Sequence, residues 1–273
     1  MSFTMAFIGG GNMASSIIGG LVASGFDAGA IWAADPSAES LSRLQQVAPV
    51  NTTSDNSAAV AAADVVVLAV KPQIMKAVAE GLAADVQARK PLIISIAAGI
   101  EVASLQHWLG GNQAIVRTMP NTPALVRAGA TGLFANGEVS DEQRRQAATI
   151  MQAVGSVRWF DTEAALDAVT AVSGSGPAYF FLVMEAMQSA GEKLGLSADD
   201  AKALTLQTAL GAATMALQSD VEPDELRRRV TSPNGTTERA IGELEQGGLR
   251  NIFEQALTAA RDRSIELSRE LGD

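Results

Sequence analysis

Residues 232–237, with the sequence SPNGTT, place hydroxyl groups and turn-forming residues directly before a helical pattern. The first backbone N–H groups of a helix have no partner inside the helix, and its N-terminus carries a partial positive charge. Such a loop is suited to hold a small carboxylate. Helix capping would account for one threonine, but it does not readily account for both Thr236 and Thr237. The loop is therefore a candidate substrate site.

A second candidate site is the glycine-rich segment of residues 9–14, with the sequence GGGNMA. It matches the dinucleotide-binding fingerprint, in which Gly9 permits a tight turn, Gly11 lets a pyrophosphate approach the backbone, and Ala14 lets helix and strand pack closely. A glycine string alone is also typical of flexible turns. This one follows a strand pattern and precedes a helical pattern, which favours a nicotinamide cofactor.

The choice between NAD(H) and NADP(H) depends on residues at the end of the second strand pattern. An acidic side chain at the position of Asp35 normally accepts hydrogen bonds from the ribose 2′-hydroxyl and repels a 2′-phosphate, which favours NAD(H). Ser37 and Arg43 follow closely and would serve a phosphate if Asp35 pointed away. Asp35 and Ser37 would equally serve to cap the next helix. The residues alone leave these alternatives open.

Three further segments follow expected strands: residues 69–72 (AVKP), 95–99 (SIAAG) and 119–123 (MPNTP). The carboxyl ends of strands are where open α/β sheets bind ligands, so these segments are expected to shape a cleft. Rigid turns would explain the proline and glycine of any one segment without a ligand. A fourth segment, residues 173–179 (SGSGPAY), predicts a helix start with Pro177 in the first turn.

Composition narrows the class of protein. The 273 residues carry a formal net charge of -10, which argues against a nucleic-acid partner, and the one dense basic run covers residues 227–229. There is no cysteine and one histidine, His107, which leaves little for a metal site. The first residues lack a basic signal region, and the longest apolar stretches are interrupted by Asp64, Asp167 or Lys71. We expect a cytoplasmic enzyme without a metal or a membrane partner.

Strand and helix patterns alternate over the first 160 residues, which predicts an α/β fold with a Rossmann-like doubly wound sheet. The run of β-branched residues and leucine at 65–70 is typical of a strand buried on both faces. The expected strands are residues 4–9, 31–35, 65–70, 92–96, 114–119, 131–135 and 157–160. Helices are expected between several of them, including residues 13–23 and 37–47.

The pattern changes after Asp161, because the rest of the chain has only helical periodicity rich in Ala, Leu and Met. The expected helices are residues 178–194, 198–217, 236–246 and 249–271. We therefore predict two domains, a dinucleotide-binding domain of residues 1–161 and an all-α domain of residues 162–273. Helices this apolar usually pack against a partner, so the second domain is expected to bind substrate and to form a homodimer or an assembly of dimers.

Taken together, these segments resemble the pyrroline-5-carboxylate reductase family along nearly the whole chain. The glycine loop, AVKP, SIAAG, MPNTP and SGSGPAY occur in the family's order, and residues 230–237 with Ala240, Ile241, Leu244 and Glu245 resemble its C-terminal signature. One departure is Asn234, where the family usually has glycine, and asparagine is the next best residue for a left-handed turn. The resemblance implies NAD(P)H-dependent reduction of the cyclic imine 1-pyrroline-5-carboxylate to L-proline, the last step of proline biosynthesis.

The resemblance also implies roles for individual residues. Thr237 would be the catalytic residue, donating a hydrogen bond to the ring nitrogen of the substrate, while Ser232 and the backbone at Gly235 and Thr236 would hold the carboxylate. Asp220 falls at an acidic family position near the substrate ring, and Glu163 at one at the entrance to the helical domain, so both are candidate substrate-binding residues. Asn56, Lys71, Pro72 and Ala97 would border the ribose and nicotinamide of NADP(H), with NAD(H) as the alternative, and helices of a second subunit would complete the site. The remaining cofactor-binding candidates are Ile8, Gly9, Gly11, Asn12, Met13, Asp35, Ser37, Ala69 and Val70.

The expected chemistry agrees with the small supply of acid–base residues. A protonated imine is already electrophilic, so hydride can attack its carbon without a strong protein acid, and positioning supplies much of the acceleration. The nearest rival, a β-hydroxyacid dehydrogenase, requires a catalytic lysine with an asparagine one turn later. After Pro177 the sequence offers only Lys193, followed by Ser197. A non-catalytic nucleotide sensor is the other rival, and it would not need the SPNGTT loop.

Overall fold

The computed structural model describes residues 3–272. Contacts divide the chain into two compact units. The first, called the sheet unit here, contains the residues up to Ser175 together with those from Ala259 onward. The second, called the helical unit, is Gly176–Thr258.

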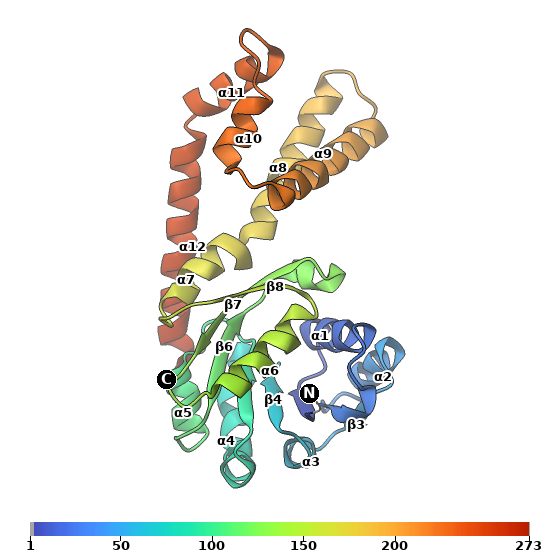
Figure 1. The fold of residues 1–273 in the computed structure, drawn as a ribbon, viewed down its shortest axis with the longest axis vertical. Coiled ribbons are helices and arrows are strands. Elements are labelled where there is room, and N and C mark those ends of the chain that lie inside the picture. The colour runs from blue at the N-terminus through green and yellow to red at the C-terminus, as the bar shows by residue number, and fades with distance from the viewer. Residues whose placement is uncertain (1–2, 273) are drawn as a thin grey trace. The chain divides into compact units, whose positions relative to one another are not determined.

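The sheet unit is built on a sheet with helices beside it (Figure 1). The sheet has eight strands in the order β3-β2-β1-β4-β5-β6-β7-β8. Neighbouring strands are parallel except for β6 and β7, which are antiparallel. The strands are β1 (Met5–Ile8), β2 (Ile31–Ala34), β3 (Asn51–Thr53), β4 (Val65–Leu68), β5 (Leu92–Ser95), β6 (Ile115–Met119), β7 (Gly129–Ala135) and β8 (Gly155–Trp159). This arrangement confirms the predicted Rossmann-like α/β fold.

Helices connect the strands and cover the sheet. They are α1 (Asn12–Ala23), α2 (Ala38–Val47), α3 (Asn56–Ala61), α4 (Pro72–Arg89), α5 (Val102–Trp108), α6 (Asp141–Gln152) and α7 (Ala165–Val169), with short 3-10 turns η1 (Ala28–Ala30) and η2 (Thr122–Val126). Side chains of β1 alternate between two apolar clusters, Met5 and Phe7 in the one that contains α1 residues, Ala6 and Ile8 in the one that contains α4 residues. The sheet is therefore buried on both faces, as the apolar strand patterns predict.

Two features of the sheet differ from the sequence expectation. The strand β3 was not predicted, because Asn51–Thr53 is short and polar and carries no apolar alternation. The antiparallel direction of β7 was not predicted either. The connection from Met119 to Gly129 is too short for a parallel crossover, which takes about a dozen residues, so β7 returns beside β6.

The helical unit contains the helices α8 (Gly176–Lys193), α9 (Ala198–Gln218), α10 (Pro223–Arg229) and α11 (Thr236–Gln246) and the first part of α12 (Leu249–Gly272). The long helices lie where the periodicity predicts them. The helix α10 was not predicted, because its sequence PDELRRR has no apolar periodicity. No strand occurs in the described part of this unit, in agreement with the predicted all-α domain.

The division into units falls later than the predicted boundary at residue 161. The segment that follows the last strand, α7, contacts β7 and β6 and so belongs to the sheet unit. It continues into a π-helical turn, Thr170–Gly174, closed by a 2.8 Å hydrogen bond from Ser175 N–H to Thr170 O. The C-terminal part of α12 also belongs to the sheet unit, since Ser264 Oγ donates to Asp167 Oδ1 at 2.8 Å.

One helical segment, residues 165–193, is apolar and long enough to cross a membrane by length and composition alone. The sequence expectation that Asp167 interrupts this stretch is therefore not supported by length and composition. A single segment of this kind is weak evidence for a membrane span, because helices of soluble proteins pass the same criterion. Its exposed side chains include Phe180, Phe181 and Leu182, each more than 60% exposed in the isolated chain.

Candidate active site

The glycine loop connects β1 to α1 and has the geometry of a phosphate-binding turn. Gly9 has φ +106°, and an added Cβ would lie 2.7 Å from Ala69 O, so only glycine fits there. Gly11 is the residue before the first turn of α1, and a Cβ on it would meet no atom of residues 3–272 within 4 Å. Open space in front of a helix N-terminus is what a pyrophosphate needs. Ala14 is 1% exposed, as expected for close helix–strand packing.

Asp35 follows β2 and points toward this loop. Its Oδ2 accepts a 2.7 Å hydrogen bond from Gly10 N–H, and its Oδ1 accepts a 2.8 Å bond from Ser37 N–H. The Ser37 hydroxyl in turn accepts from Ser40 N–H at 3.2 Å and caps α2. The structure therefore shows the capping role for Ser37 alone, while Asp35 bonds the glycine loop and its contact with the cofactor ribose stays a prediction. Arg43 lies on α2, where it contacts Glu39 and Ser40.

The other cofactor candidates lie at the carboxyl ends of adjacent strands. Ile8 ends β1, Ala69 and Val70 follow β4, and Ala97 follows β5. These three strands are neighbours in the sheet, so the structure gathers the segments at one edge. Lys71 and Pro72 begin α4, Asn56 begins α3, and Asn12 and Met13 begin α1.

The segment after β6 is held as a rigid turn. Asn121 is 9% exposed, and its Oδ1 accepts from Ala130 N–H at 2.9 Å while its Nδ2 donates to Ser173 O at 3.0 Å. It joins the 119–123 segment to β7 and to the π-helical turn. The rigid-turn interpretation of this segment therefore has direct structural support, and Asn121 is a buried linker that sequence reasoning did not single out.

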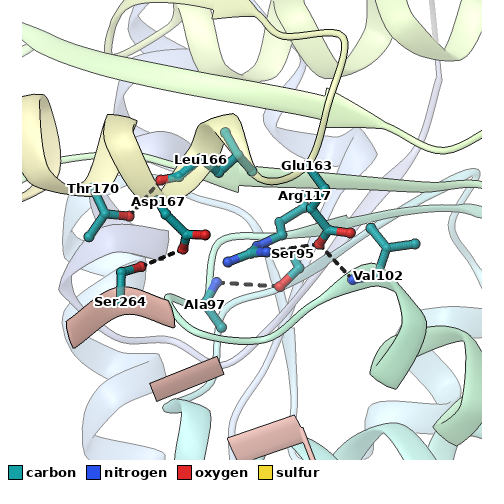
Figure 2. A network of polar contacts seen from close by, with 9 residues as sticks. All are labelled: Ser95, Ala97, Val102, Arg117, Glu163, Leu166, Asp167, Thr170 and Ser264. Atoms are coloured by element: carbon teal, nitrogen blue, oxygen red, sulfur yellow. Dashed lines mark hydrogen bonds and ion pairs between the residues drawn. The ribbon is translucent and has the colours of Figure 1, made fainter. Parts of the chain in front are cut away.

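Glu163 makes contacts inside the sheet unit that the sequence did not predict. Its Oε1 accepts from Arg117 Nη1 at 2.8 Å and from Val102 N–H at 2.8 Å, as Figure 2 shows. Arg117 lies on β6, and its side chain is only 6% exposed. A charged residue within an apolar strand pattern was the available signal, because a buried charge requires a partner. These contacts give Glu163 a structural role, and its substrate contact stays a prediction.

The substrate loop lies wholly in the helical unit. Asn234 has φ +57°, which confirms the left-handed turn expected at this position. Its N–H donates to Glu238 Oε2 at 2.7 Å, and Gly235 N–H donates to Ser232 O at 3.0 Å. Gly235 is the N-cap of α11, so Thr236 and Thr237 are the first helical residues.

The hydroxyl groups of this loop are not used for capping. Within residues 3–272, the side-chain oxygens of Ser232, Thr236 and Thr237 make no hydrogen bond, and α11 has no side-chain cap. Capping therefore accounts for neither threonine. The loop presents three hydroxyls and a helix N-terminus, which together suit a carboxylate and an adjacent polar atom. Asp220 is exposed in the same unit, between α9 and α10.

Charges near the loop are largely paired within the helical unit. Arg228 and Arg229 both contact Glu225 on α10, at 2.7 and 2.8 Å. The hydrogen bond from Arg229 is the main cause that lowers the pKa of the Glu225 carboxyl from its ordinary value. Similarly, the hydrogen bond from Arg250 lowers the pKa of Glu245, so both carboxylates are ionised at neutral pH. The basic run at 227–229 is thus mostly neutralised. In the described range 3–272, no group of three His, Asp or Glu residues is arranged to hold a metal.

A Rossmann-like sheet with a phosphate-binding glycine loop, followed by a helical unit with an uncapped hydroxyl loop, defines an NAD(P)-dependent oxidoreductase. Residues 163–267 match the family described as pyrroline-5-carboxylate reductase dimerisation, and residues 4–99 match the one described as NADP oxidoreductase coenzyme F420-dependent. The chain is 59% identical over 268 residues to the pyrroline-5-carboxylate reductase of Pseudomonas aeruginosa, covering 98% of both chains. The chain belongs to the pyrroline-5-carboxylate reductase family.

Solved structures agree with this assignment. The pyrroline-5-carboxylate reductase of Coxiella burnetii is 50% identical with a TM-score of 0.95, and the match covers 98% of this chain and 99% of the other. The Plasmodium falciparum enzyme, whose structure holds NADP, is 29% identical with a TM-score of 0.86, and the match covers 98% of each chain. The expected reaction class, an NAD(P)H-dependent oxidoreductase acting on a CH–NH group, is confirmed at the level of the family. The two rival classes are set aside.

The dimerisation match also explains the apolar surface of the helical unit. Phe181 on α8 and Leu210 on α9 are 62% and 61% exposed in the isolated chain. Apolar side chains exposed to this degree over neighbouring helices are typical of a subunit interface. The predicted helical dimerisation domain and the homo-oligomer are therefore confirmed.

Proposed function

We propose that this chain reduces 1-pyrroline-5-carboxylate to L-proline with NADPH, with the substrate held at the loop 232–237. The observation that carries this proposal is the set of unused hydroxyls at the start of α11. Ser232, Thr236 and Thr237 are side chains that the fold itself does not employ, at a helix terminus that attracts anions. These hydroxyls are exposed or half-buried, so they are accessible to a ligand that replaces water as their partner.

The sheet unit is proposed to hold the cofactor. Gly9 and Gly11 shape the turn, and the first N–H groups of α1, at Asn12 and Met13, face the pyrophosphate. Ile8, Ala69, Val70, Lys71, Pro72 and Ala97 lie at the sheet edge where the nicotinamide ribose and ring bind in Rossmann folds, and Asn56 begins the neighbouring helix α3. The bound cofactor supplies the hydride.

NADP(H) is the proposed cofactor, with NAD(H) as the alternative. The relative from Plasmodium falciparum binds NADP, and the N-terminal family match is to NADP oxidoreductases. Both Asp35 oxygens already accept backbone N–H bonds, so part of its negative charge is compensated at the glycine loop. The hydroxyl of Ser37 retains its proton for a phosphate oxygen, because it acts as an acceptor in the cap.

The substrate loop is proposed to orient the imine. The N–H groups at Gly235 and Thr236, with the Ser232 hydroxyl, would bind the carboxylate at the positive end of α11. The Thr237 hydroxyl would donate to the ring nitrogen and help to retain its proton. Since the protonated imine is already electrophilic, this positioning accounts for the catalysis without a strong acid. Asp220 is kept as a proposed contact near the ring.

We further propose a cytoplasmic homodimer or an assembly of dimers, in which helices of a second subunit complete each site. The exposed apolar side chains of α8 and α9 support the interface. Light scattering should give a mass that is a multiple of the dimer. A Leu210→Glu variant should dissociate, whereas Leu194→Glu should not, because Leu194 is 87% exposed and lies just after the end of α8.

The first test of the reaction is turnover of 1-pyrroline-5-carboxylate with NADPH and NADH side by side, followed by nicotinamide absorbance. Turnover with either cofactor supports the proposed reaction, and the ratio of kcat/KM reports the cofactor preference. Absence of turnover with both would contradict the proposal and point to a different cyclic imine.

A further inference from the structure

We propose that the buried Arg117–Glu163 ion pair is a positioning device for the loop 96–101, the segment that connects β5 to α5. The inference rests on the proposed function, which places Ala97 of this loop beside the nicotinamide. Neither residue touches the reacting atoms, so both are positioning residues. All the contacts involved lie within the sheet unit.

The ion pair is poorly suited to a purely stabilising role. The side chains of Arg117 and Glu163 are 6% and 24% exposed, and their atoms approach to 2.8 Å. Burying two charges costs desolvation that largely cancels their attraction, so a buried pair adds little net stability over an apolar pair of the same volume. What the pair does provide is a fixed geometry for the carboxylate of Glu163.

That geometry places Oε1 of Glu163 at the first turn of α5. Val102 is the first residue of α5, and its N–H donates to this oxygen at 2.8 Å. The N-cap residue Glu101 makes no side-chain cap with any described residue, so a carboxylate from a distant segment performs the capping. The far end of the loop 96–101 is thereby fixed to the ion pair, as Figure 2 shows.

The N-terminal end of the loop 96–101 is fixed by β6, the strand that carries Arg117. Ser95 is paired with Arg117 in the register of β5 and β6. Its carbonyl accepts from Thr118 Oγ1 at 3.0 Å, and its Oγ accepts from Ala97 N–H at 3.4 Å. Two consecutive residues of β6 therefore hold the loop, Thr118 at its start and Arg117, through Glu163, at its end.

The C-terminal part of α12 packs against the same loop. Gly99 has φ +73°, and an added Cβ would lie 3.2 Å from Leu271 Cδ1 and 3.4 Å from Leu267 Cβ. Ser104 Oγ donates to Gly272 O at 3.1 Å. The loop is thus confined between the ion pair and α12 and has little freedom to shift.

Such confinement matters for hydride transfer, because a misplacement of about 1 Å at a reacting centre can cost on the order of 100-fold in rate. A loose loop would still let the cofactor bind through its phosphates at the glycine loop. We therefore expect disruption of the device to lower kcat much more than it weakens NADPH binding.

The sharpest variant is Val102→Pro, which removes the N–H bonded to Glu163 and replaces the buried Val102 side chain by another apolar one of similar size. Proline suits the first position of a helix, and Glu101 already has the extended conformation that a residue before proline requires, with φ -81° and ψ 157°. We expect kcat to fall about tenfold while the dissociation constant for NADPH changes less than about threefold. The deuterium isotope effect with labelled NADPH should rise, since hydride transfer becomes more rate-limiting.

A pair of double variants provides the second measurement. Arg117→Met with Glu163→Gln removes both charges and keeps an oxygen that accepts from Val102 N–H, whereas Arg117→Met with Glu163→Ala removes that oxygen as well. We expect the first to keep most of the wild-type kcat and the second to behave like Val102→Pro. Glu142→Gln, which breaks an exposed pair with Arg145 on α6, is the matched control and should leave kcat unchanged.

Equal kcat in wild type, Val102→Pro and the two double variants would overturn the inference. So would a loss of NADPH affinity that matches the loss of kcat. Wild-type turnover in the same assay keeps this test separate from the proposed function, because an inactive wild type would contradict the reaction itself rather than the positioning role.

Discussion

The backbone N–H of Gly10 donates a 2.7 Å hydrogen bond to Oδ2 of Asp35, so the acidic residue after β2 is bonded directly to the glycine loop. The position that sets cofactor choice in Rossmann folds therefore also helps to fix the phosphate-binding turn. An added Cβ on Gly10 would lie 3.5 Å from this carboxylate, in ordinary contact. Loop geometry and cofactor preference are linked through one side chain.

Replacement of Asp35 by asparagine should shift the cofactor preference toward NADPH. The amide keeps one acceptor for a backbone N–H but removes the negative charge that repels a 2′-phosphate. We expect the ratio of kcat/KM with NADPH to that with NADH to rise about tenfold. Asp27→Asn is the control, because Asp27 also accepts a backbone N–H, from Gly29, in the same unit. An unchanged ratio would show that Asp35 does not act on the ribose.

Gly9 and Gly11 should respond differently to alanine. Gly9→Ala combines a positive φ with a Cβ 2.7 Å from a backbone oxygen, so it should destabilise the fold by at least about 2 kcal/mol in urea unfolding. Gly11→Ala meets open space at φ -71°, and as a change at the N-cap of α1 it should lower the stability by no more than about 1 kcal/mol. It should nevertheless weaken NADPH binding, measured by fluorescence titration. Normal NADPH affinity in Gly11→Ala would place the pyrophosphate elsewhere.

Thr237→Ala should lower kcat/KM for 1-pyrroline-5-carboxylate by about 10- to 100-fold, the loss expected when a hydrogen bond to a charged group is removed. Thr237→Ser keeps the hydroxyl and should remain within about threefold of wild type. Thr214→Ala is the matched control, since the Thr214 hydroxyl donates to Leu210 O on its own helix. Full activity in Thr237→Ala would remove the proposed catalytic role.

Acid should destabilise the sheet unit partly through Asp64. The hydrogen bond from Thr4 N–H is the largest cause that holds the pKa of this carboxyl below its ordinary value of 3.8, with further contributions from the Thr4 hydroxyl and Arg89. A lowered folded-state pKa stabilises the fold above the unfolded-state value, and this stabilisation is lost as pH falls through the folded-state pKa.

Asp64→Asn should therefore be slightly less stable than wild type at pH 7, by less than about 1 kcal/mol because the group is half exposed. The difference should shrink as the pH drops below 3.8. Arg89→Met should have a smaller effect, since the backbone bond contributes most. Urea unfolding at several pH values measures the difference in free energy of unfolding between Asp64→Asn and wild type. A difference that grows in acid would contradict the prediction.

The sequence and the structure agree best where one local pattern suffices. The apolar run of β1, the glycine loop and the long helices α8, α9, α11 and α12 each follow from a pattern that a short window of sequence contains. The left-handed turn at Asn234 was also predictable, because few residues adopt that conformation readily.

The sequence prediction and the structure disagree where a contact joins segments that are distant in the sequence. Nothing near Glu163 in the sequence indicates that it pairs with Arg117 on β6, although a charge inside an apolar strand required some partner. Asp35 had two plausible orientations from its sequence position, and the N–H of Gly10 selects one. Contacts of α7 with β6 and β7 extend the sheet unit beyond the last strand, and the bond from Ser264 to Asp167 adds the C-terminal part of α12 to the same unit.

By itself the sequence determined the order of elements, the two kinds of architecture and the residue types available for chemistry, because propensity and periodicity act over neighbouring residues. Tertiary structure alone decided which oxygens remain free for a ligand and which are consumed by the fold. A side chain can make only a limited number of hydrogen bonds. Glu163 uses part of this capacity to cap a distant helix, whereas the Thr237 hydroxyl keeps all of its hydrogen-bonding capacity for a ligand.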